Sequence, residues 1–125
     1  MPHRRIAARE LGELFGVLSH PERLQIVEEL RQGELDVASL QGILGISHAK
    51  TSRQLAILRA QKLVAERQEG RHVYYRLTDR TLALWVAQGL RFIETSRFTS
   101  DEIREAARMS AAHWLEQAPD QTPGA

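Results

Sequence analysis

The sequence predicts a mainly α-helical domain of about six helices with one small β-hairpin, arranged as a winged helix-turn-helix. Two observations predict it: two short helical segments joined by a tight turn at Gly45, and a strand-rich pair of segments directly after them. Helices and a hairpin in this order are typical of winged helices. A length of 125 residues suits one domain. We expect that domain to span residues 1–117, followed by a disordered tail over 118–125.

The first two helices are predicted by apolar periodicity and by cap residues. Apolar side chains recur at helical spacing between residues 5 and 18. Ser19 is followed three positions later by Glu22, which is the pattern of a capping box, and Pro21 between them is tolerated in a first helical turn. We therefore expect Ser19 to cap a second helix that ends at Gly33, and the neighbouring His20 to have a structural or capping role.

The helix-turn-helix itself is predicted after residue 35. Asp36 is the expected cap and Gly45 the expected end of a short third helix. Ser47 then begins a fourth helix that continues to about residue 61. At about 100° per residue, one face of this helix must form part of the core. The expected core stripe consists of Thr51, Leu55 and Leu58.

The opposite face of the fourth helix combines small side chains with long hydrogen-bond donors. This combination suits a helix that lies in the major groove of double-stranded DNA, because small residues permit close approach while Arg and Lys reach guanine edges and phosphates. The expected DNA contacts of this segment are Ser47, His48, Ala49, Lys50, Ser52, Arg53 and Gln54.

Charge is concentrated in the same part of the chain. The net charge is +1, yet residues 47–76 carry seven Lys or Arg and two acids, which makes them +5 and the rest of the chain −4. Such segregation favours a local surface that meets an anion, most often a nucleic acid. A solvated charged face explains the same charges without any partner, and charge alone does not separate these two interpretations.

A β-hairpin is predicted directly after the fourth helix. Residues 63–68 and 72–77 are rich in strand-forming side chains and bracket a short loop that contains Gly70. The tip of this wing is expected to bring Arg67, Arg71 and His72 to the phosphate backbone or into the narrow minor groove of DNA. A hairpin that only covers the core is the plainer alternative, and both uses are compatible.

The last two helices predict a dimer. A fifth helix over residues 82–93 is apolar around so much of its circumference that a partner chain is expected to cover part of it. A capping box at residues 99–102 opens a sixth helix. A twofold homodimer would place two recognition helices about 34–36 Å apart on a pseudo-palindromic DNA site. The expected dimer interface consists of Leu11, Leu14, Phe15, Leu82, Trp85, Val86, Leu90, Ile93 and Trp114.

Three segments carry a resemblance to a known family. They are residues 18–26, residues 44–47 together with 51–55, and residues 70–77. In this order they resemble the ArsR/SmtB family of bacterial winged-helix repressors, and the likeness covers residues 11–95. The resemblance implies a homodimeric transcriptional regulator, in the simplest case a repressor. Such a repressor binds operator DNA and releases it when an inducer, often a metal or metalloid, binds away from the DNA face.

The chain departs from the family's two best-known metal sites. Where arsenic- and cadmium-type members begin the third helix with Cys-Val-Cys, this chain has Asp36-Val37-Ala38, and it contains no cysteine at all. The four positions that bind zinc in other members align here with Asp79, Thr81, Phe92 and Thr95. One carboxylate cannot hold Zn²⁺, which needs three or four ligands. We therefore expect no metal site and no cofactor, and we expect Asp79 to cap the fifth helix.

The sequence gives little support for a histidine metal site or for a catalytic nucleophile. The five histidines include no pair at helical i,i+3 or i,i+4 spacing, and the Gly45–Ala49 stretch, which is similar to a nucleophile elbow, lies between two helices and not after a strand. An enzyme is therefore not expected. The apolar stretches are too short to span a membrane, so we expect a cytoplasmic protein. A winged helix that binds another protein and no specific DNA is the alternative, and the inducer, whether organic ligand, metal or partner protein, stays open.

Overall fold

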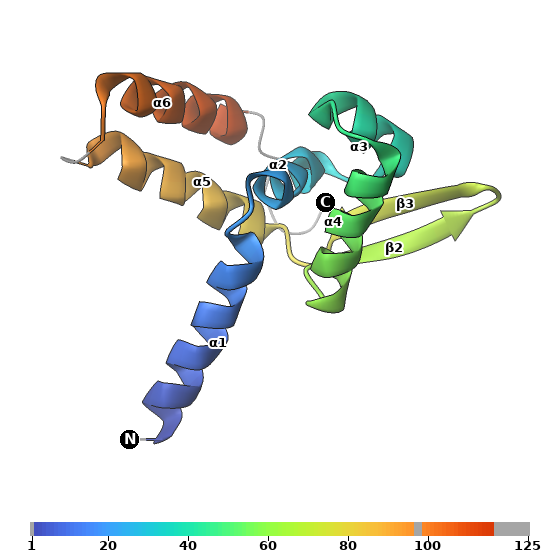
Figure 1. Cartoon of the computed structure of the whole chain (residues 1–125), viewed down its shortest axis with the longest axis horizontal. Helices are drawn as coiled ribbons and strands as arrows, with labels where there is room; N and C mark the ends of the chain where they lie inside the picture. The colour runs from blue at the N-terminus through green and yellow to red at the C-terminus, as the bar shows by residue number, and fades with distance from the viewer. Residues whose placement is uncertain (1, 97–98, 117–125) are drawn as a thin grey trace, which may run out of the picture.

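A computed structural model gives the fold of residues 2–96 and 99–116, with side chains described as far as Trp114 (Figure 1). Six α-helices, a turn of 3₁₀ helix and a three-stranded sheet make up these residues, in agreement with the predicted winged helix-turn-helix. The predicted tail over residues 118–125 lies outside them. In chain order the elements are α1 (Pro2–Leu18), α2 (Pro21–Glu29), η1 (Leu30–Gln32), β1 (Leu35–Asp36), α3 (Val37–Leu44), α4 (His48–Ala60), β2 (Val64–Glu69), β3 (His72–Leu77), α5 (Thr81–Thr95) and α6 (Asp101–Glu116).

The start of α2 corrects one predicted cap. His20 is the N-cap residue, and its Nδ1 accepts a hydrogen bond from the backbone N–H of Glu22 at 3.3 Å. Ser19 instead donates its hydroxyl proton to the carbonyl oxygen of Gly16 at 2.7 Å, so it ends α1 and does not begin α2. The capping role expected of His20 is confirmed, while the capping box at Ser19 is wrong because the chain turns one residue later.

The core lies where α2, α3, α4 and α5 meet the base of the hairpin. Ile26, Val27 and Leu40 are fully buried there, together with the predicted stripe of α4. Burying a side chain of this size contributes about 1.5–3 kcal/mol. Because α4 packs through this stripe, its opposite face is turned outward, which is the feature that matters for function.

The sheet contains one strand more than the sequence predicts. The order is β1-β3-β2, and β1 pairs with β3 antiparallel through Leu35 and Tyr75 and through Asp36 and Tyr74. A two-residue strand has too little alternation to be recognised in a sequence. It joins the segment before α3 to the wing and so fixes the wing beside the helix-turn-helix.

Helix α6 runs back along α5 and covers one side of it (Figure 1). The contact is lined by small side chains, of which Ala87 on α5 and Ala107 and Ala111 on α6 are buried. Ser100 caps α6, since its hydroxyl accepts a hydrogen bond from the backbone N–H of Ile103 at 3.3 Å. The predicted sixth helix is therefore confirmed.

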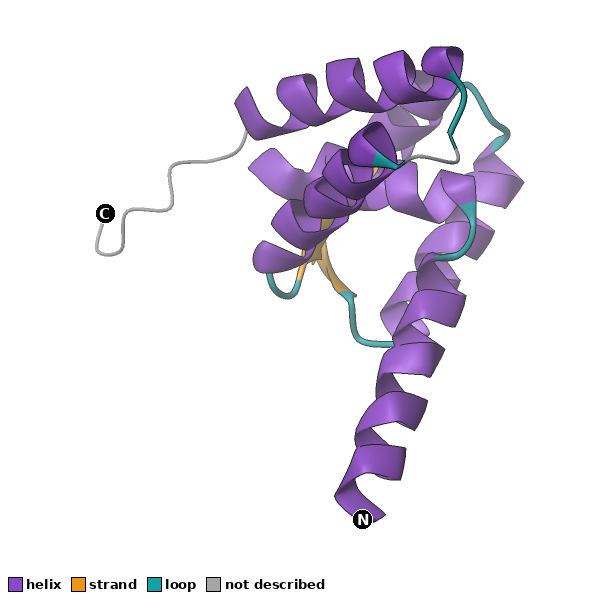
Figure 2. Cartoon of the chain, turned by 90° about the vertical axis from the view of Figure 1, so that its left-hand side faces the viewer, coloured by secondary structure: helices purple, strands orange, loops and turns teal. Residues whose placement is uncertain are grey.

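Helix α1 projects from the rest of the molecule as an arm (Figures 1 and 2). Every residue from position 2 to position 13 is exposed, and only the C-terminal end of α1 packs against the core, through Leu14, Val17 and the buried Leu18. The exposed part includes Ile6 and Leu11, and Phe15 follows in the next turn. Isolated helices of this length are marginal in water, so the arm needs a further surface to pack on.

Candidate nucleic-acid interface

The turn between α3 and α4 is fixed by backbone conformation and by capping hydrogen bonds. Gly45 ends α3 in the left-handed conformation at φ 67°, and its N–H donates to the carbonyl oxygen of Gln41. The Ser47 hydroxyl accepts from the backbone N–H of Lys50 at 3.1 Å, and Thr51 donates its hydroxyl proton to the Ser47 carbonyl oxygen at 2.9 Å. These bonds hold the first turn of α4 at a defined angle to α3.

Helix α4 has one buried and one exposed face, as predicted. Thr51, Leu55 and Leu58 are fully buried. Among the residues expected to contact DNA, Ser52 is half-buried. The exposed ones on this segment are Ser47, His48, Ala49, Lys50 and Arg53. The backbone N–H groups of His48 and Ala49 also lie in the first turn of α4, where a helix favours bound anions such as phosphate.

The two cations of this exposed face, Lys50 and Arg53, have no partner among the residues that the structure describes. Within residues 2–96 and 99–116, neither Lys50 nor Arg53 forms an ion pair or a side-chain hydrogen bond. Arg59, at the C-terminal end of the same helix, differs because its Nη1 lies 2.5 Å from a carboxylate oxygen of Glu66. The unpaired charge of α4 is therefore concentrated in its first two turns, beside the small side chains.

Gln54 does not belong to this exposed face, which corrects the prediction. Its side chain is only 7% exposed. The amide oxygen accepts from Nη1 of Arg23 at 2.8 Å, and the amide nitrogen donates to a carboxylate oxygen of Glu22 at 3.3 Å. Arg23 also donates Nε–H to the carbonyl oxygen of Val17 at 2.5 Å. No sequence spacing signals these contacts, because the partners lie more than thirty residues from Gln54.

Arg67 lies in the middle of the wing and not at its tip, which corrects a second prediction. It is paired in register with Tyr74 on the next strand, and its guanidinium stacks over the Tyr74 ring at 4.9 Å. The same guanidinium lies 2.5 Å from Glu34 and 2.6 Å from Glu69. These hydrogen bonds raise the pKa of Arg67 further above its ordinary value, and Arg67 lowers the pKa of Glu34. Two carboxylates therefore neutralise this arginine.

The wing tip is formed by a two-residue loop, Gly70 and Arg71. Gly70 has φ 60°, a conformation that two-residue hairpin loops require and that glycine adopts without strain. Arg71 and His72 are both exposed, and within the described residues Arg71 forms no ion pair. Tyr75 faces the core, since it packs against the buried cluster and its burial raises the pKa of its hydroxyl.

The residues predicted for a dimer interface divide into three groups. Leu14, Leu82 and Val86 are half-buried and pack against the core. Leu90 and Trp114 are half-buried outside the core cluster. The exposed members are Leu11, Phe15, Trp85 and Ile93, and Phe15 stacks on Trp85 with ring centroids 5.3 Å apart. An open groove of about 770 Å³ with four aromatic side chains in its wall runs along this surface of α1, α5 and α6.

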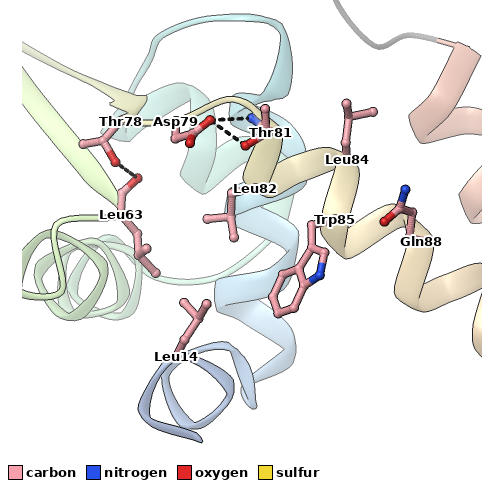
Figure 3. Close-up of a pocket in the computed structure, with 9 residues that line it drawn as sticks. All are labelled: Leu14, Leu63, Thr78, Asp79, Thr81, Leu82, Leu84, Trp85 and Gln88. Carbon is pink, nitrogen blue, oxygen red and sulfur yellow. Dashed lines mark hydrogen bonds between the residues drawn. The ribbon is translucent and has the colours of Figure 1, made fainter. Parts of the chain in front are cut away.

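The two carboxylates at the family's metal positions accept hydrogen bonds where α3 and α5 begin. Asp36 is the N-cap residue of α3, whereas the N-cap residue of α5 is Arg80 and not Asp79, which corrects that expectation. Asp36 Oδ1 accepts from the backbone N–H of Ser39 at 2.8 Å at the start of α3. Asp79 Oδ1 accepts from the backbone N–H and the hydroxyl of Thr81, at 2.9 and 2.6 Å, just before α5 (Figure 3). These bonds lower the pKa of both aspartates. In the part of the chain that the structure describes, no three His, Cys, Asp or Glu residues gather as a metal site would require.

Comparison with known proteins gives one family. A family model described as "Bacterial regulatory protein, arsR family" matches residues 20–66. The "Transcriptional repressor SmtB homolog" of Synechocystis sp. is 42% identical over 72 residues, which are 58% of this chain and 54% of the relative. A "Biofilm growth-associated repressor" of Agrobacterium fabrum is 35% identical over 79 residues, which are 63% of this chain and 68% of the relative.

Solved structures agree with these relatives. The transcriptional repressor BigR from Xylella fastidiosa is 33% identical, with a TM-score of 0.66, and the match covers 77% of this chain and 97% of that one. Reduced HlyU from Vibrio cholerae is 27% identical with the same TM-score and 97% coverage of its chain. The alignment with the Synechocystis relative spans only about half of that protein. Within residues 2–96 and 99–116, no helix is long and apolar enough to cross a membrane.

Proposed function

Because the chain belongs to the ArsR family of bacterial regulatory proteins, we propose that it is a sequence-specific DNA-binding transcriptional regulator, acting as a repressor on a pseudo-palindromic operator. The observation that carries this proposal is the exposed face of α4. That face presents Lys50 and Arg53, which have no partner among the described residues, beside the small residues Ala49 and Ser52. Unpaired donors on a narrow helix face are what direct contact with base edges in the major groove needs.

Each part of the interface has its own role in this proposal. Ser47 and the first N–H groups of α4 hold a phosphate, while His48, Lys50 and Arg53 reach base edges or the adjacent phosphates. Arg71 at the wing tip, with His72 beside it, meets the backbone or the minor groove and contributes affinity without selecting bases. Gln54 and Arg67 are left out, because other side chains of the chain already hold them.

A homodimer is part of the proposal. It is supported by the exposed apolar side chains of the α1 arm and of α5, since Phe15 of α1 stacks on Trp85 of α5 and both line one groove. Twofold symmetry would put two α4 helices about one turn of DNA apart, roughly 34–36 Å. The inducer is not assigned, since the acids at the family's metal positions accept hydrogen bonds at the starts of α3 and α5.

A retardation assay with the DNA upstream of the chain's own gene tests the proposal, with an unrelated duplex of equal length as the control. We expect a shifted band for the upstream DNA only, and we expect affinity to fall steeply with salt as counterions are released from phosphates. No shift even at low salt would contradict the proposal. It would favour the alternative in which the winged helix binds another protein.

A further inference from the structure

Arg23 connects three helices through one guanidinium group. It stands in the first turn of α2, and its Nε–H donates to the carbonyl oxygen of Val17, in the last turn of α1, at 2.5 Å. Its Nη1 donates to the side-chain oxygen of Gln54, in the middle of α4, at 2.8 Å. Gln54 in turn donates to Glu22 at 3.3 Å. We call these four residues, Val17, Glu22, Arg23 and Gln54, the Arg23 bridge.

The bridge constrains the rotation of α4 about its own axis. Apolar contacts such as those of Leu55 and Leu58 have little directionality, whereas hydrogen bonds to a planar guanidinium fix both distance and angle. Gln54 is nearly fully buried, so its amide must keep these partners or lose their hydrogen bonds without compensation. A fixed Gln54 therefore fixes the direction of Arg53, the preceding residue, which points about 100° away around the helix.

The bridge also ties α4 to the arm. Val17 is two residues from Phe15, whose ring stacks on Trp85 of α5. A change in the packing of α1 therefore acts on the Val17 carbonyl, and through Arg23 on Gln54. Lysine at position 23 would not replace this link, because it is a point donor without the fixed fork of the guanidinium.

We propose that Arg23 is a positioning residue for DNA recognition: it holds α4 in the orientation that presents Arg53 to the bases, and it sets that orientation from the end of α1. This inference rests on the proposed function, since it names how the same DNA-contacting face is aligned. Arg23 itself is half-buried and needs no contact with DNA for this role.

The test compares two duplexes, one selected by the wild-type chain from a randomised pool and one with the same base composition in scrambled order. We expect Arg23→Met to lower the ratio of the two affinities at least tenfold, while affinity for the scrambled duplex changes less than twofold. Gln54→Met cuts the bridge from the α4 side and should give the same result if Arg23→Met fails to fold. The double variant should lose no more than either single one, because one cut already opens the bridge.

Arg104→Met is the matched control. Arg104 also donates to backbone carbonyls, those of Ser96 and Thr99 at 2.9 and 3.3 Å, and its loss removes the same charge, but it lies on α6. We expect this variant to keep the wild-type affinity ratio. Arg23→Lys should behave as Arg23→Met, which separates the fork geometry from the charge.

A distance measurement adds a readout that needs no DNA. The chain has no cysteine, so spin labels at Glu13→Cys on α1 and Ala60→Cys on α4 are unique, and both positions are exposed. With labelled chain diluted in unlabelled chain, we expect one narrow α1–α4 distance in wild type and a broadened one in Arg23→Met. An unchanged distance or an unchanged affinity ratio in Arg23→Met would overturn this inference but not the proposed function. A wild-type chain that does not distinguish the duplexes would overturn the proposed function together with it.

Discussion

Arg53 is the residue on which base recognition depends most in the proposed function. It is exposed on the second turn of α4 and forms no ion pair within the described residues. We expect Arg53→Ala to lower affinity for a selected duplex by roughly 1–3 kcal/mol and to relax the preference at one base pair. Titrations with each base pair of the duplex substituted in turn measure both effects.

Arg59→Ala is the control for that prediction. Arg59 stands on the same helix but at its C-terminal end, paired with Glu66, so its loss removes one charge without touching the exposed face of the first turns. It should leave the base preference unchanged. If Arg53→Ala lost affinity equally for the selected and the scrambled duplex, Arg53 would not be a base-reading residue.

The raised pKa of the Glu28 carboxyl group predicts that the stability of the fold depends on pH. It is buried beside Arg31, with which it forms an ion pair, and burial, followed by the neighbouring Glu29, raises its pKa from 4.5 to about 7. Between pH 4.5 and about pH 7, Glu28 therefore holds its proton more tightly in the folded chain than in the unfolded chain. The stabilisation is therefore complete below about pH 4.5 and is lost as the pH rises through about 7.

The difference in unfolding free energy between wild type and Glu28→Gln isolates this effect. We expect wild type to lose up to about 3 kcal/mol relative to the variant between pH 4.5 and 8, since one pKa unit corresponds to about 1.4 kcal/mol. Urea titrations at several pH values measure it. A difference that stays constant over this range would show that Glu28 titrates alike in both states.

Single residues were predicted from the sequence where their contacts are local. The Asp36 cap and the Ser47 cap bond the backbone three residues ahead, and cap residues at this spacing are visible in a sequence. The hydrogen bonds that Gln54 and Arg67 form within the chain were not predicted, because their partners, Arg23 and Glu34, lie 31 and 33 residues away. Helical spacing placed Gln54 at the edge of the exposed face. Only the packed structure shows that its side chain is buried there and not exposed.

At the scale of elements, the tight turn between α3 and α4 is the junction that orients the recognition helix. Gly45 ends α3 at φ 67°, and an added Cβ there would meet no atom within 4 Å. The cost of Gly45→Ala is therefore conformational, about 1 kcal/mol of unfolding free energy, and Gly45→Asn should cost less. Urea unfolding of each variant measures these costs.

Gly42→Ala, in the same helix, is expected to change the free energy of unfolding in the opposite direction. Gly42 lies inside α3 with an ordinary helical backbone, and the space around it is also free. We expect this change to stabilise the protein by about 0.5–1 kcal/mol, because alanine loses less backbone entropy than glycine in a helix. If Gly45→Ala and Gly42→Ala changed the free energy of unfolding in the same direction, the conformational explanation would be contradicted.

Elements were predictable in proportion to their length and periodicity. All six helices and both hairpin strands follow from apolar spacing, caps and the turn at Gly70. Strand β1 was missed, since its two residues pair with Tyr74 and Tyr75 far along the chain. The extent to which α1 stands away from the core was also not predicted, because amphipathic spacing indicates a buried face without saying what covers it.

At the scale of the whole molecule, the proposed dimer forms through the α1 arm and α5. Phe15 is 52% exposed although it stacks on Trp85. We expect wild type to sediment as a dimer and Phe15→Glu to weaken self-association at least tenfold, because a carboxylate at an apolar contact must give up its hydration. Sedimentation velocity over a range of concentrations measures this.

Met109→Glu is the comparison for that variant. Met109 is 60% exposed on α6 and lies outside the predicted dimer interface, so the change adds the same charge to an exposed apolar position elsewhere. It should sediment as wild type does. Equal effects of the two variants would contradict a dimer through α1 and α5, and a monomeric wild type would contradict the dimer itself.

The central claim is that two copies of this chain read two half-sites with their α4 helices. The most direct test is the affinity of wild type for a selected inverted repeat, compared with the same duplex carrying five extra base pairs between the half-sites. The insertion turns one half-site by about half a helical turn, out of reach of a rigid dimer. We expect two chains per intact duplex and at least a hundredfold weaker binding after insertion. Equal affinity for both duplexes would contradict the claim.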